Sequence, residues 1–519
     1  MKTLKYAWRF LIRSKSYTII NLLGLAFSLA CCIILLRYIH RELTVDSHCI
    51  DREQVYGIKA DMGGNKYLSI LINRTDSSLI DQRYINKQSN FIPLEKDYVM
   101  VGANRFPSRI IVTDSIFFQL FRYPVVQGNI TLPSPHSALV TEAFAHKLFG
   151  KENPIGKIIR CSNGKDVTLE GVLGNPGNKT FLQFDVVLSK ALSDSWERMA
   201  VDLFSFMPGT DIDKLNKTGS VPRYVNSPES GDTRTYTYSL IPVKQFYWDS
   251  SIGNEETSMF STGSYSHLWI MIGVCLLVLL AGIINFINIY LVVMLRRGKE
   301  YGLKKVFGAR GKELFLNIWI ENTLLVSAAM LIAWLFVEVS TVPVRNLFNY
   351  QFGYTTFDWQ LSLGILVVLP LVTSLYPFIK YNYTLPIISI RSIGSESHSI
   401  RSRILFLGIQ YILTFLLVVS LYFNNQLNML LSTEPGFRTK DIIIAQLAYE
   451  SKDFNIYTEE SMKQRQERVN ALDKELSSCP YIEDFESSYT DILKGDYGSD
   501  FINEQGKKIY LNMRHATPH

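Results

Sequence analysis

Glu321 is the residue whose type and place most suggest chemistry, because it lies alone in a long apolar run. It is the only charged residue between Leu314 and Val337. A carboxylate at the centre of a membrane costs about 2.5 to 3.5 kcal/mol on insertion scales, so it is normally turned inward and partnered. Asn285 and Asn288, in the preceding apolar run, are the candidate partners. Three roles stay open for Glu321: a structural hydrogen bond, a relay of protons or substrate, and a contact with the segment between the two runs.

The segment 296–313, which joins these two apolar runs, is strongly basic. It carries seven Lys or Arg residues against two Glu. At a rise of about 1.5 Å per residue, each flanking run exceeds the roughly 30 Å of bilayer hydrocarbon, so both are expected to span a membrane. The positive-inside rule then places the segment on the cytoplasmic side. As a helix it is amphipathic, which leaves two roles open: a contact with anionic lipid head groups, or a docking surface for a cytoplasmic partner.

Motifs of the common catalytic and cofactor sites are absent from the sequence. The stretch 150–158 (GKENPIGKI) imitates a phosphate-binding loop, but Ile158 stands where that motif requires the Ser or Thr that binds Mg²⁺. No H-E-x-x-H, C-x-x-C or nucleophile-elbow pattern occurs. The sequence therefore predicts no catalytic residue, no metal site and no cofactor, and indicates that the chain is not an enzyme.

The composition is typical of a chain that is partly membrane-embedded and partly globular. Hydrophobic residues make up 47% of the 519 residues and charged residues 19%. The net charge of +6 is concentrated beside the apolar runs, so it reports membrane orientation and gives no support for nucleic-acid binding. Cys31, Cys32 and Cys275 fall within apolar runs. Cys49 and Cys161 are expected outside the cell, where they could form a disulfide.

The remaining chain predicts a membrane anchor followed by a large soluble region. The first apolar run, 16–36, is longer than the roughly 7 to 15 apolar residues of a signal peptide, which indicates a retained anchor. Gly24 and Ser28 within it form a pair of small residues that would let another helix approach closely. Residues 37–267 contain strand-like runs separated by Gly, Pro and Asn turns, with short helices predicted over 114–121 and 142–149. The predicted fold is a membrane protein, with an α-helical transmembrane bundle and an α+β extracytoplasmic domain.

The predicted order alternates cytoplasmic, membrane-spanning and extracytoplasmic parts. From the N-terminus these are a basic cytoplasmic segment (1–15), a first span (16–36), the extracytoplasmic core domain (37–267), a second span (268–295), the basic segment (296–313), a third span (314–337), an extracytoplasmic loop (338–358), a fourth span (359–379), a cytoplasmic linker (380–403), a fifth span (404–423) and the start of a second extracytoplasmic domain (424–519). A basic segment, a span and an outer region thus occur twice, which predicts a repeat whose second copy is truncated.

The basic segment resembles the signature of a known family. Residues 300–309 (EYGLKKVFGA) are similar to the E-x-G-x-[RK]-[RK]-x-x-G-A signature of FtsX-like permeases of the MacB class. Residues 114–118 (DSIFF), with Gly150, 154–156 (PIG) and Val172, resemble the periplasmic core domain of the same proteins. The resemblance covers nearly the whole chain, although longer relatives have a second periplasmic domain followed by three more spans.

The resemblance implies a permease subunit of an ATP-binding-cassette (ABC) complex in a bacterial inner membrane. Such a subunit would transmit ATPase-driven motion to its periplasmic domain for export or extraction of a substrate. A separate cytoplasmic ABC ATPase would dock under segment 296–313, two permease subunits would pair, and a periplasmic adaptor or envelope protein is a further implied partner. The coupling residues that it implies are Glu300, Gly302, Lys304, Lys305, Gly308, Ala309 and Arg310. The alternative function is a non-transporting envelope sensor or scaffold that regulates a cell-wall hydrolase.

Overall fold

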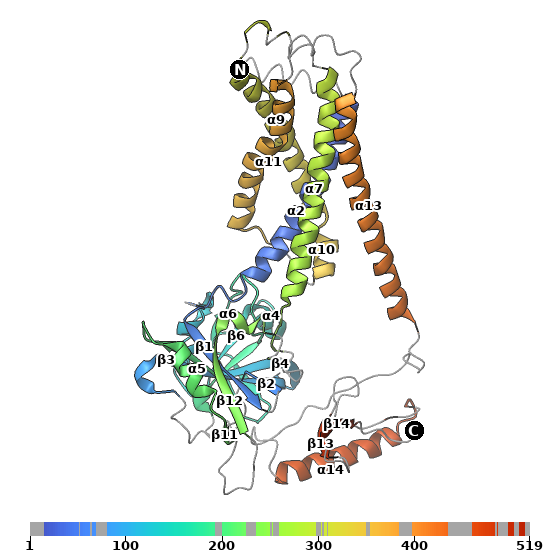
Figure 1. Ribbon diagram of the computed structural model, residues 1–519. Helices are drawn as coiled ribbons and strands as arrows, with labels where there is room; N and C mark the ends of the chain where they lie inside the picture. The colour runs from blue at the N-terminus through green and yellow to red at the C-terminus, as the bar shows by residue number, and fades with distance from the viewer. Residues whose placement is uncertain are drawn as a thin grey trace. The chain divides into compact units, whose positions relative to one another are not determined.

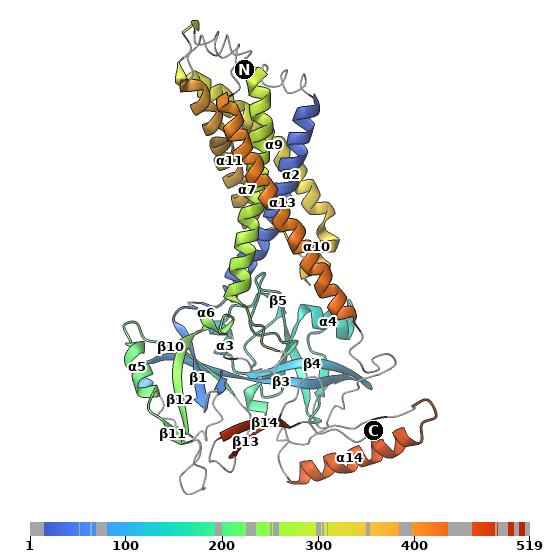
Figure 2. The same cartoon turned by 45° about the vertical axis from the view of Figure 1, so that its right-hand side comes forward.

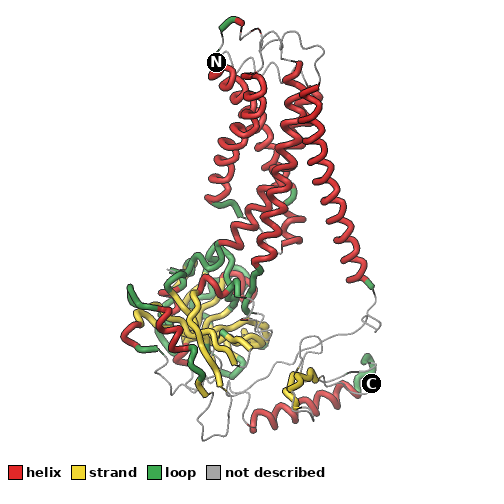
Figure 3. The backbone as a smooth tube through the Cα atoms, viewed as in Figure 1, coloured by secondary structure: helices red, strands yellow, loops and turns green. Residues whose placement is uncertain are grey.

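The computed structural model divides into two compact units, one containing Met1–Leu43 and Tyr265–Ile443 and the other Thr44–Ser264 and Ile444–His519. Figure 3 shows helices in the first unit and the strands gathered in the second. The residues that the structure describes are 15–50, 52–62, 65–68, 80–192, 200–224, 235–249, 252, 259–296, 303, 306–308, 310–348, 353–383, 397–433, 459–482, 485, 497–502 and 508–513.

The first unit is a bundle of long helices, the last of which diverges from the others along its length (Figure 1). They are α2 (Lys15–Leu43), α7 (Tyr265–Arg296), α9 (Gly311–Val339), α11 (Thr356–Tyr383) and α13 (Ser397–Ser432), with the short α10 (Thr341–Phe348) after α9. Among the described residues, α2, α7, α9 and α11 contain stretches long and apolar enough to cross a membrane. The helix α13 runs over the predicted fifth span, 404–423.

Helix α2 packs against both α7 and α9, and α9 packs against α11. Small residues permit the close approach of α2 to α7, as expected for helices that associate within a bilayer. A Cβ atom added to Gly24 would lie 2.9 Å from Asn285 Nδ2, and one added to Gly282 would lie 2.5 Å from Ser28 Cβ. Gly24 and Ser28 therefore both face α7, and the sequence had marked them as a point of close helix approach.

The second unit contains a mixed β-sheet in the order β11-β12-β1-β10-β3-β4-β9-β6-β8-β5 (Figure 2). In addition, β2 pairs with β1, and β7 pairs with β3 and β8. The pairs β4 with β9 and β6 with β8 are parallel, and the other described pairs of this sheet are antiparallel. The strands are β1 (Val55–Met62), β2 (Asn65–Tyr67), β3 (Ile85–Val101), β4 (Asn104–Thr113), β5 (Val125–Gly128), β6 (Ser137–Thr141), β7 (Ile158–Cys161), β8 (Asp166–Leu173), β9 (Val186–Ser189), β10 (Val201–Phe206), β11 (Arg223–Tyr224) and β12 (Thr235–Pro242).

Successive side chains of the central strands enter different apolar cores, because neighbouring residues of a strand point to opposite faces. Phe91 and Ile111 belong to one buried cluster, whereas their neighbours Ile92 and Ile110 belong to another. Helices α3 (Phe117–Leu120) and α6 (Val243–Phe246) contribute to the first cluster, and α4 (Glu142–Phe149) contributes Phe144 to the second. The domain is therefore α+β, with apolar residues buried on both faces of its sheet.

Two predictions about this domain need correction. The helix expected over 114–121 is only one turn long, because Asp114 Oδ1 accepts from the backbone N–H groups of Ile116 and Phe117 and starts the helix late. The disulfide considered for Cys49 and Cys161 is not formed, since neither cysteine takes part in a disulfide. Cys49 lies in the first buried cluster and Cys161 in the second, so the two cysteines belong to separate cores.

The C-terminal part of the chain contributes a helix and a hairpin. These are α14 (Glu459–Ser477) and the antiparallel pair β13 (Tyr497–Ile502) and β14 (Lys508–Met513). Only five residues separate the two strands, which is a common length for a hairpin loop. The described residues of this region are thus folded locally.

Candidate functional site

Glu321 is buried within the helix bundle, with 7% of its surface exposed. Tyr290 of α7 donates its hydroxyl to Glu321 Oε2 at 3.4 Å. The predicted pairing with Asn288 is wrong, because neither polar atom of the Asn288 side chain has a hydrogen-bond partner among the described residues. At 100° per residue, Tyr290 points about 160° away from Asn288 around α7. Asn285 is also turned elsewhere, since its amide lies against Gly24 of α2.

The contacts between antiparallel helices place further polar side chains at the level of Glu321. Asn322 Nδ2 donates to Ser374 Oγ of α11 at 2.8 Å. On the other side, the contacts of Gly24 with Asn285 and of Ser28 with Gly282 fix an antiparallel register between α2 and α7. That register puts Asn21 opposite Asn288, which is two residues, or about 3 Å along the helix axis, from Tyr290. We call this level the inner polar layer, which comprises Asn21, Asn288, Tyr290, Glu321, Asn322 and Ser374.

The inner polar layer is incompletely hydrogen-bonded. Asn21 and Asn322 are at most 4% exposed, yet the side-chain oxygen of each has no partner among the described residues. Both polar atoms of Asn288 and the indole N–H of Trp319 are also buried without a hydrogen-bond partner among the described residues. A buried polar group without a partner costs about 1 to 3 kcal/mol, and a hydrogen bond between membrane helices contributes only about 0.6 kcal/mol on average. Several buried polar atoms at this level therefore contribute no hydrogen bond between the helices within the described part of the chain.

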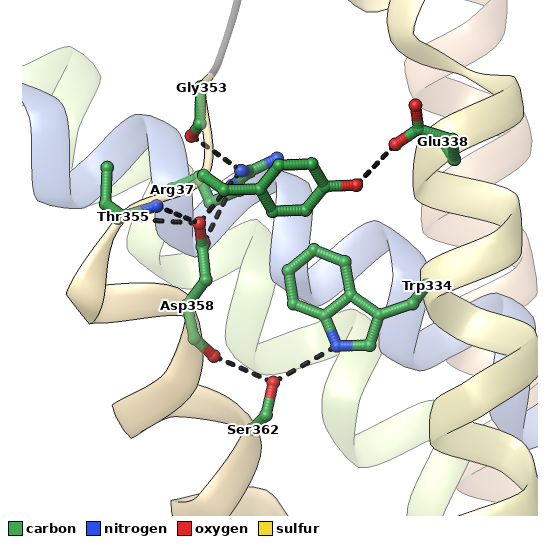
Figure 4. A network of polar contacts seen from close by, with 8 residues as sticks. Arg37, Trp334, Glu338, Gly353, Thr355, Asp358 and Ser362 are labelled. Carbon is green, nitrogen blue, oxygen red and sulfur yellow. Dashed lines mark hydrogen bonds and ion pairs between the residues drawn. The ribbon is translucent and has the colours of Figure 1, made fainter.

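A second polar cluster lies about 12 residues from the inner polar layer along α9 and α11, centred on an ion pair between Arg37 of α2 and Asp358 of α11 (Figure 4). Arg37 Nε donates to Asp358 Oδ1 at 2.8 Å and Nη2 to Oδ2 at 2.9 Å, while Nη2 also donates to the Gly353 carbonyl at 2.8 Å. The guanidinium lies 5.6 Å from the centre of the Trp334 ring and 5.5 Å from that of Tyr354. We call Arg37, Asp358, Trp334 and Tyr354 the outer clasp.

Neighbouring groups hold the outer clasp in one geometry. The Thr355 N–H donates to Asp358 Oδ2 at 2.8 Å. Trp334 of α9 donates its indole N–H to Ser362 Oγ at 3.1 Å, and Ser362 in turn donates to the Asp358 carbonyl at 2.7 Å. Removing one partner of a buried ion pair costs about 3 to 5 kcal/mol, because the other charge is left uncompensated. Loss of either charge of the outer clasp should therefore destabilise the packing of α2 on α11.

The sequence does not predict the outer clasp, and Arg37 is the one weak signal of it. Arg37 is the first charged residue after the apolar run 16–36, and it was assigned to the soluble domain. In the structure α2 continues through Leu43, seven residues beyond the predicted end of the span. Arg37 is 8% exposed and Asp358 is 3% exposed. The ion pair neutralises the arginine, so that the helix can carry it within the bundle.

Only part of the predicted coupling segment belongs to the described residues. Glu300, Gly302, Lys304, Lys305 and Ala309 lie outside them. Gly308 has a φ of +88°, in the left-handed region that favours glycine, and Arg310 is the N-cap residue of α9. Just before this turn, Val306 is 62% exposed and Phe307 is 86% exposed. The segment thus presents apolar side chains at a sharp turn that leads directly into α9.

A metal centre is not found among the described residues. Among them, no three His, Cys, Asp or Glu residues lie close enough together to hold a metal ion. The polar groups gathered by the structure are instead those of the helix bundle, in the inner polar layer and the outer clasp. These groups can hold helices to one another, through an ion pair in the outer clasp and through an incompletely hydrogen-bonded set of side chains in the inner polar layer.

Two family models match the chain. Residues 18–217 match the MacB-like periplasmic core domain, and residues 272–386 match the C-terminal part of FtsX-like permeases. The chain belongs to the FtsX-like permeases of the MacB class. Such permeases are membrane components of ABC systems, which implies an ATPase partner and pairing of subunits. The permease is accordingly a membrane protein whose core domain, Thr44–Ser264, lies outside the cell.

Three solved structures similar to part of the permease are isolated domains or regions. A domain from Porphyromonas gingivalis, described as part of a permease protein, is 14% identical with a TM-score of 0.30, over 37% of this chain and 92% of that one. The periplasmic region of MacB from Actinobacillus actinomycetemcomitans is 13% identical with a TM-score of 0.28, over 37% and 90%. The extracellular domain of the ABC-type transporter YknZ from Gram-positive bacteria is 14% identical with a TM-score of 0.27, over 36% and 99%. No curated protein matches the permease.

Proposed function

We propose that this permease is the subunit of an ABC complex that carries ATPase-driven motion across the bacterial inner membrane to its periplasmic core domain. The motion would serve export or extraction of a substrate, and the ATP would be hydrolysed by a separate cytoplasmic subunit. Two permease subunits would pair in the complex. The observation that carries the proposal is the exposed apolar turn at Val306 and Phe307, between the basic residues of segment 296–313.

The topology supports a cytoplasmic place for this turn. Helix α2 ends at Leu43 and α7 begins at Tyr265, on either side of the core domain in the sequence. Since the core domain is extracytoplasmic, the opposite end of α7, at Arg296, and the start of α9, at Gly311, reach the cytoplasmic side. Seven basic residues in this segment agree with the positive-inside rule. A large exposed aromatic beside a Gly turn is then available to an ATPase subunit.

The test is stimulation of ATP turnover in a purified complex. The full chain, in detergent, would be mixed with each candidate ABC ATPase from its own genome, and binding and turnover would be measured. Phe307→Ser should weaken the complex about tenfold, which corresponds to 1.4 kcal/mol of lost docking energy. Reversal of charge at Lys304 and Lys305, or Gly308→Asp, should abolish stimulation while leaving the protein folded.

Ile158→Ser is the matched control, because Ile158 is an equally apolar residue, 61% exposed, in the extracytoplasmic domain. It should leave binding and turnover unchanged. Stimulation that survives Phe307→Ser and the Lys304 and Lys305 reversals would contradict the coupling role of the segment. Capture of a cell-wall hydrolase by the core domain, without any ATPase complex, would favour the alternative of a regulatory scaffold.

A further inference from the structure

The two polar levels of the helix bundle differ in how completely their groups are bonded. In the outer clasp both carboxylate oxygens of Asp358 accept hydrogen bonds from Arg37, and the guanidinium is flanked by Trp334 and Tyr354. In the inner polar layer, Asn21 and Asn322 are buried with a side-chain oxygen unpartnered among the described residues. Both carboxylate oxygens of the outer clasp are thus bonded, whereas the inner polar layer contains buried amide oxygens that accept no hydrogen bond from the described residues.

The same pair of helices carries both levels, which fixes the distance between them. Asn322 contacts Ser374, and Trp334 contacts Ser362, so that 12 residues separate the two contacts on α9 and on α11. Twelve helical residues span roughly 18 Å. The residues between the levels are apolar apart from Thr323, Ser327 and Thr373, whose hydroxyls donate to carbonyls of their own helices. Val326, Ala329 and Ala333 of α9 are fully buried there. The inner polar layer is nearer to segment 296–313 than the outer clasp is. A displacement of α9 that starts at segment 296–313 therefore reaches the incompletely bonded inner polar layer before it reaches the outer clasp.

We propose that the Arg37–Asp358 pair is a positioning joint that makes the outer ends of α2, α9 and α11 move as one body. The proposal rests on the proposed function of the permease, because it says how a push on segment 296–313 reaches the core domain. Segment 296–313 leads directly into α9, and α2 leads directly into the core domain at Thr44. The ion pair connects α2 to α11 at the end nearest to Thr44, and the Trp334 ring of α9 packs against the Arg37 guanidinium there. Without it, α9 could slide past α2 and the motion would be lost.

Replacing both Arg37 and Asp358 distinguishes a role in joining the helix ends from a role in stability alone. Arg37→Met or Asp358→Leu alone leaves one buried charge unpaired, so each should lower the melting temperature of the full chain in detergent. The double variant Arg37→Met/Asp358→Leu should regain a melting temperature close to that of the wild type, because an apolar pair often replaces a buried ion pair at little cost. Its apolar side chains have no fixed hydrogen-bond geometry, so the helix ends should nevertheless move independently.

The readout is the distance distribution between spin labels at the outer ends of α2 and α11. Leu43 and Trp359 are 51% and 80% exposed and can carry the labels in a cysteine-free background. The distribution should be narrow in the parent chain and broad in the double variant, and stimulation of the partner ATPase should fall at least about fivefold, the lower end of ordinary coupling energies. Lys59→Met/Asp249→Leu, which removes a half-buried ion pair of the core domain, is the matched control and should change neither readout.

Two outcomes would overturn the joint. The first is a double variant with the narrow distribution of the parent chain, whatever the ATPase does. The second is a broad distribution with unchanged stimulation, which would show that the outer ends need not move together. A parent chain that stimulates no ATPase would instead overturn the proposed function, and the label distances alone would then decide whether the Arg37–Asp358 pair joins the helices.

Discussion

Burial shifts the pKa values of Asp46 and His48, in the turn that follows α2, in opposite directions. Asp46 has a φ of +54° and is 2% exposed; its Oδ1 accepts from the Phe181 N–H at 3.1 Å, and its Oδ2 has no partner among the described residues. Burial raises the pKa of Asp46 to about 7, although the Phe181 N–H and the Arg52 charge oppose the rise. Burial lowers the pKa of His48 to about 4. Both groups are therefore most stable in the fold when neutral.

The two groups should contribute opposite pH dependences to the stability of the core domain. Because the native pKa of Asp46 exceeds its ordinary value of 3.8, the fold takes up a proton as pH falls from 7 to 4 and gains stability. Because the native pKa of His48 lies below its ordinary 6.5, the fold resists protonation over 6.5 to 4 and loses stability. In Asp46→Asn the melting temperature should therefore fall between pH 7 and pH 5, whereas in His48→Gln it should rise.

Scanning fluorimetry of the full chain at pH 8, 7, 6 and 5 measures this effect. One pKa unit is worth about 1.4 kcal/mol, and each kcal/mol moves the melting temperature by about 2 to 4 °C in a domain of this size. Asn is well tolerated at a positive φ, so Asp46→Asn should fold normally. Asp166→Asn, which removes an exposed carboxylate beside Arg160, is the control and should follow the wild-type profile. If the melting temperatures of Asp46→Asn and His48→Gln changed in the same direction with pH, Asp46 and His48 would not have the opposite effects predicted for them.

At the scale of the helices, the apolar runs sufficed to predict where the long elements lie but not which residues join them. The uncharged runs around residues 16–36 and 268–295 became α2 and α7, because apolar length alone selects a membrane helix. The end of α2 was missed, since Arg37 and Asp358 are 321 residues apart and nothing in either neighbourhood announces the pair. Likewise, the partner of Glu321 depends on the rotation of α7, which residue spacing constrains only after the facing helix is known.

The packing of α2 on α7 predicts that Cys32 and Cys275 can be joined. The Cys32 Sγ lies 3.7 Å from the Cys275 carbonyl, and the Cys275 Sγ lies 4.0 Å from the Cys32 carbonyl. A lipid-soluble oxidant should therefore link the two thiols. After proteolytic cleavage between α2 and α7, the two fragments should migrate as one species on a non-reducing gel and separate on a reducing gel.

Cys31 provides the matched control for this cross-link, because it is the neighbouring residue of the same helix. Successive residues of a helix point about 100° apart, so Cys31 cannot replace Cys32 in the contact. Cys31→Ser should keep the cross-link and Cys32→Ser should abolish it. Fragments that separate without reductant in the wild-type chain, or that stay joined in Cys32→Ser, would show that α2 and α7 meet in a different register.

At the scale of the whole molecule, the chain must alternate sides of the membrane at each long helix. Since the core domain between α2 and α7 is extracytoplasmic, we expect the segment between α7 and α9 on the cytoplasmic side and the residues between α9 and α11 outside again. Residues between α11 and α13 would then be cytoplasmic. If α13 crosses the membrane, as its 36 residues permit, α14 and the β13–β14 hairpin lie on the same side as the core domain.

The native cysteines provide a test of this alternation. Cys31, Cys32 and Cys275 lie within helices that cross the membrane, and Cys49 and Cys161 are buried in the core domain. Cys479, after α14, is the partly exposed thiol outside the spans. Since a thiol must be accessible to react, a membrane-impermeant maleimide added to intact spheroplasts should label the wild-type chain at Cys479, and Cys479→Ser should remove the label.

Lys312→Cys, added to Cys479→Ser, should be labelled only after the membrane is permeabilised, because we expect α9 to begin on the cytoplasmic side. Labelling of Cys479 only after permeabilisation would mean that α13 does not cross the membrane. Labelling of Lys312→Cys in intact spheroplasts would show that the bundle has the opposite orientation. The turn at Val306 and Phe307 would then not be cytoplasmic, which would contradict the proposed function.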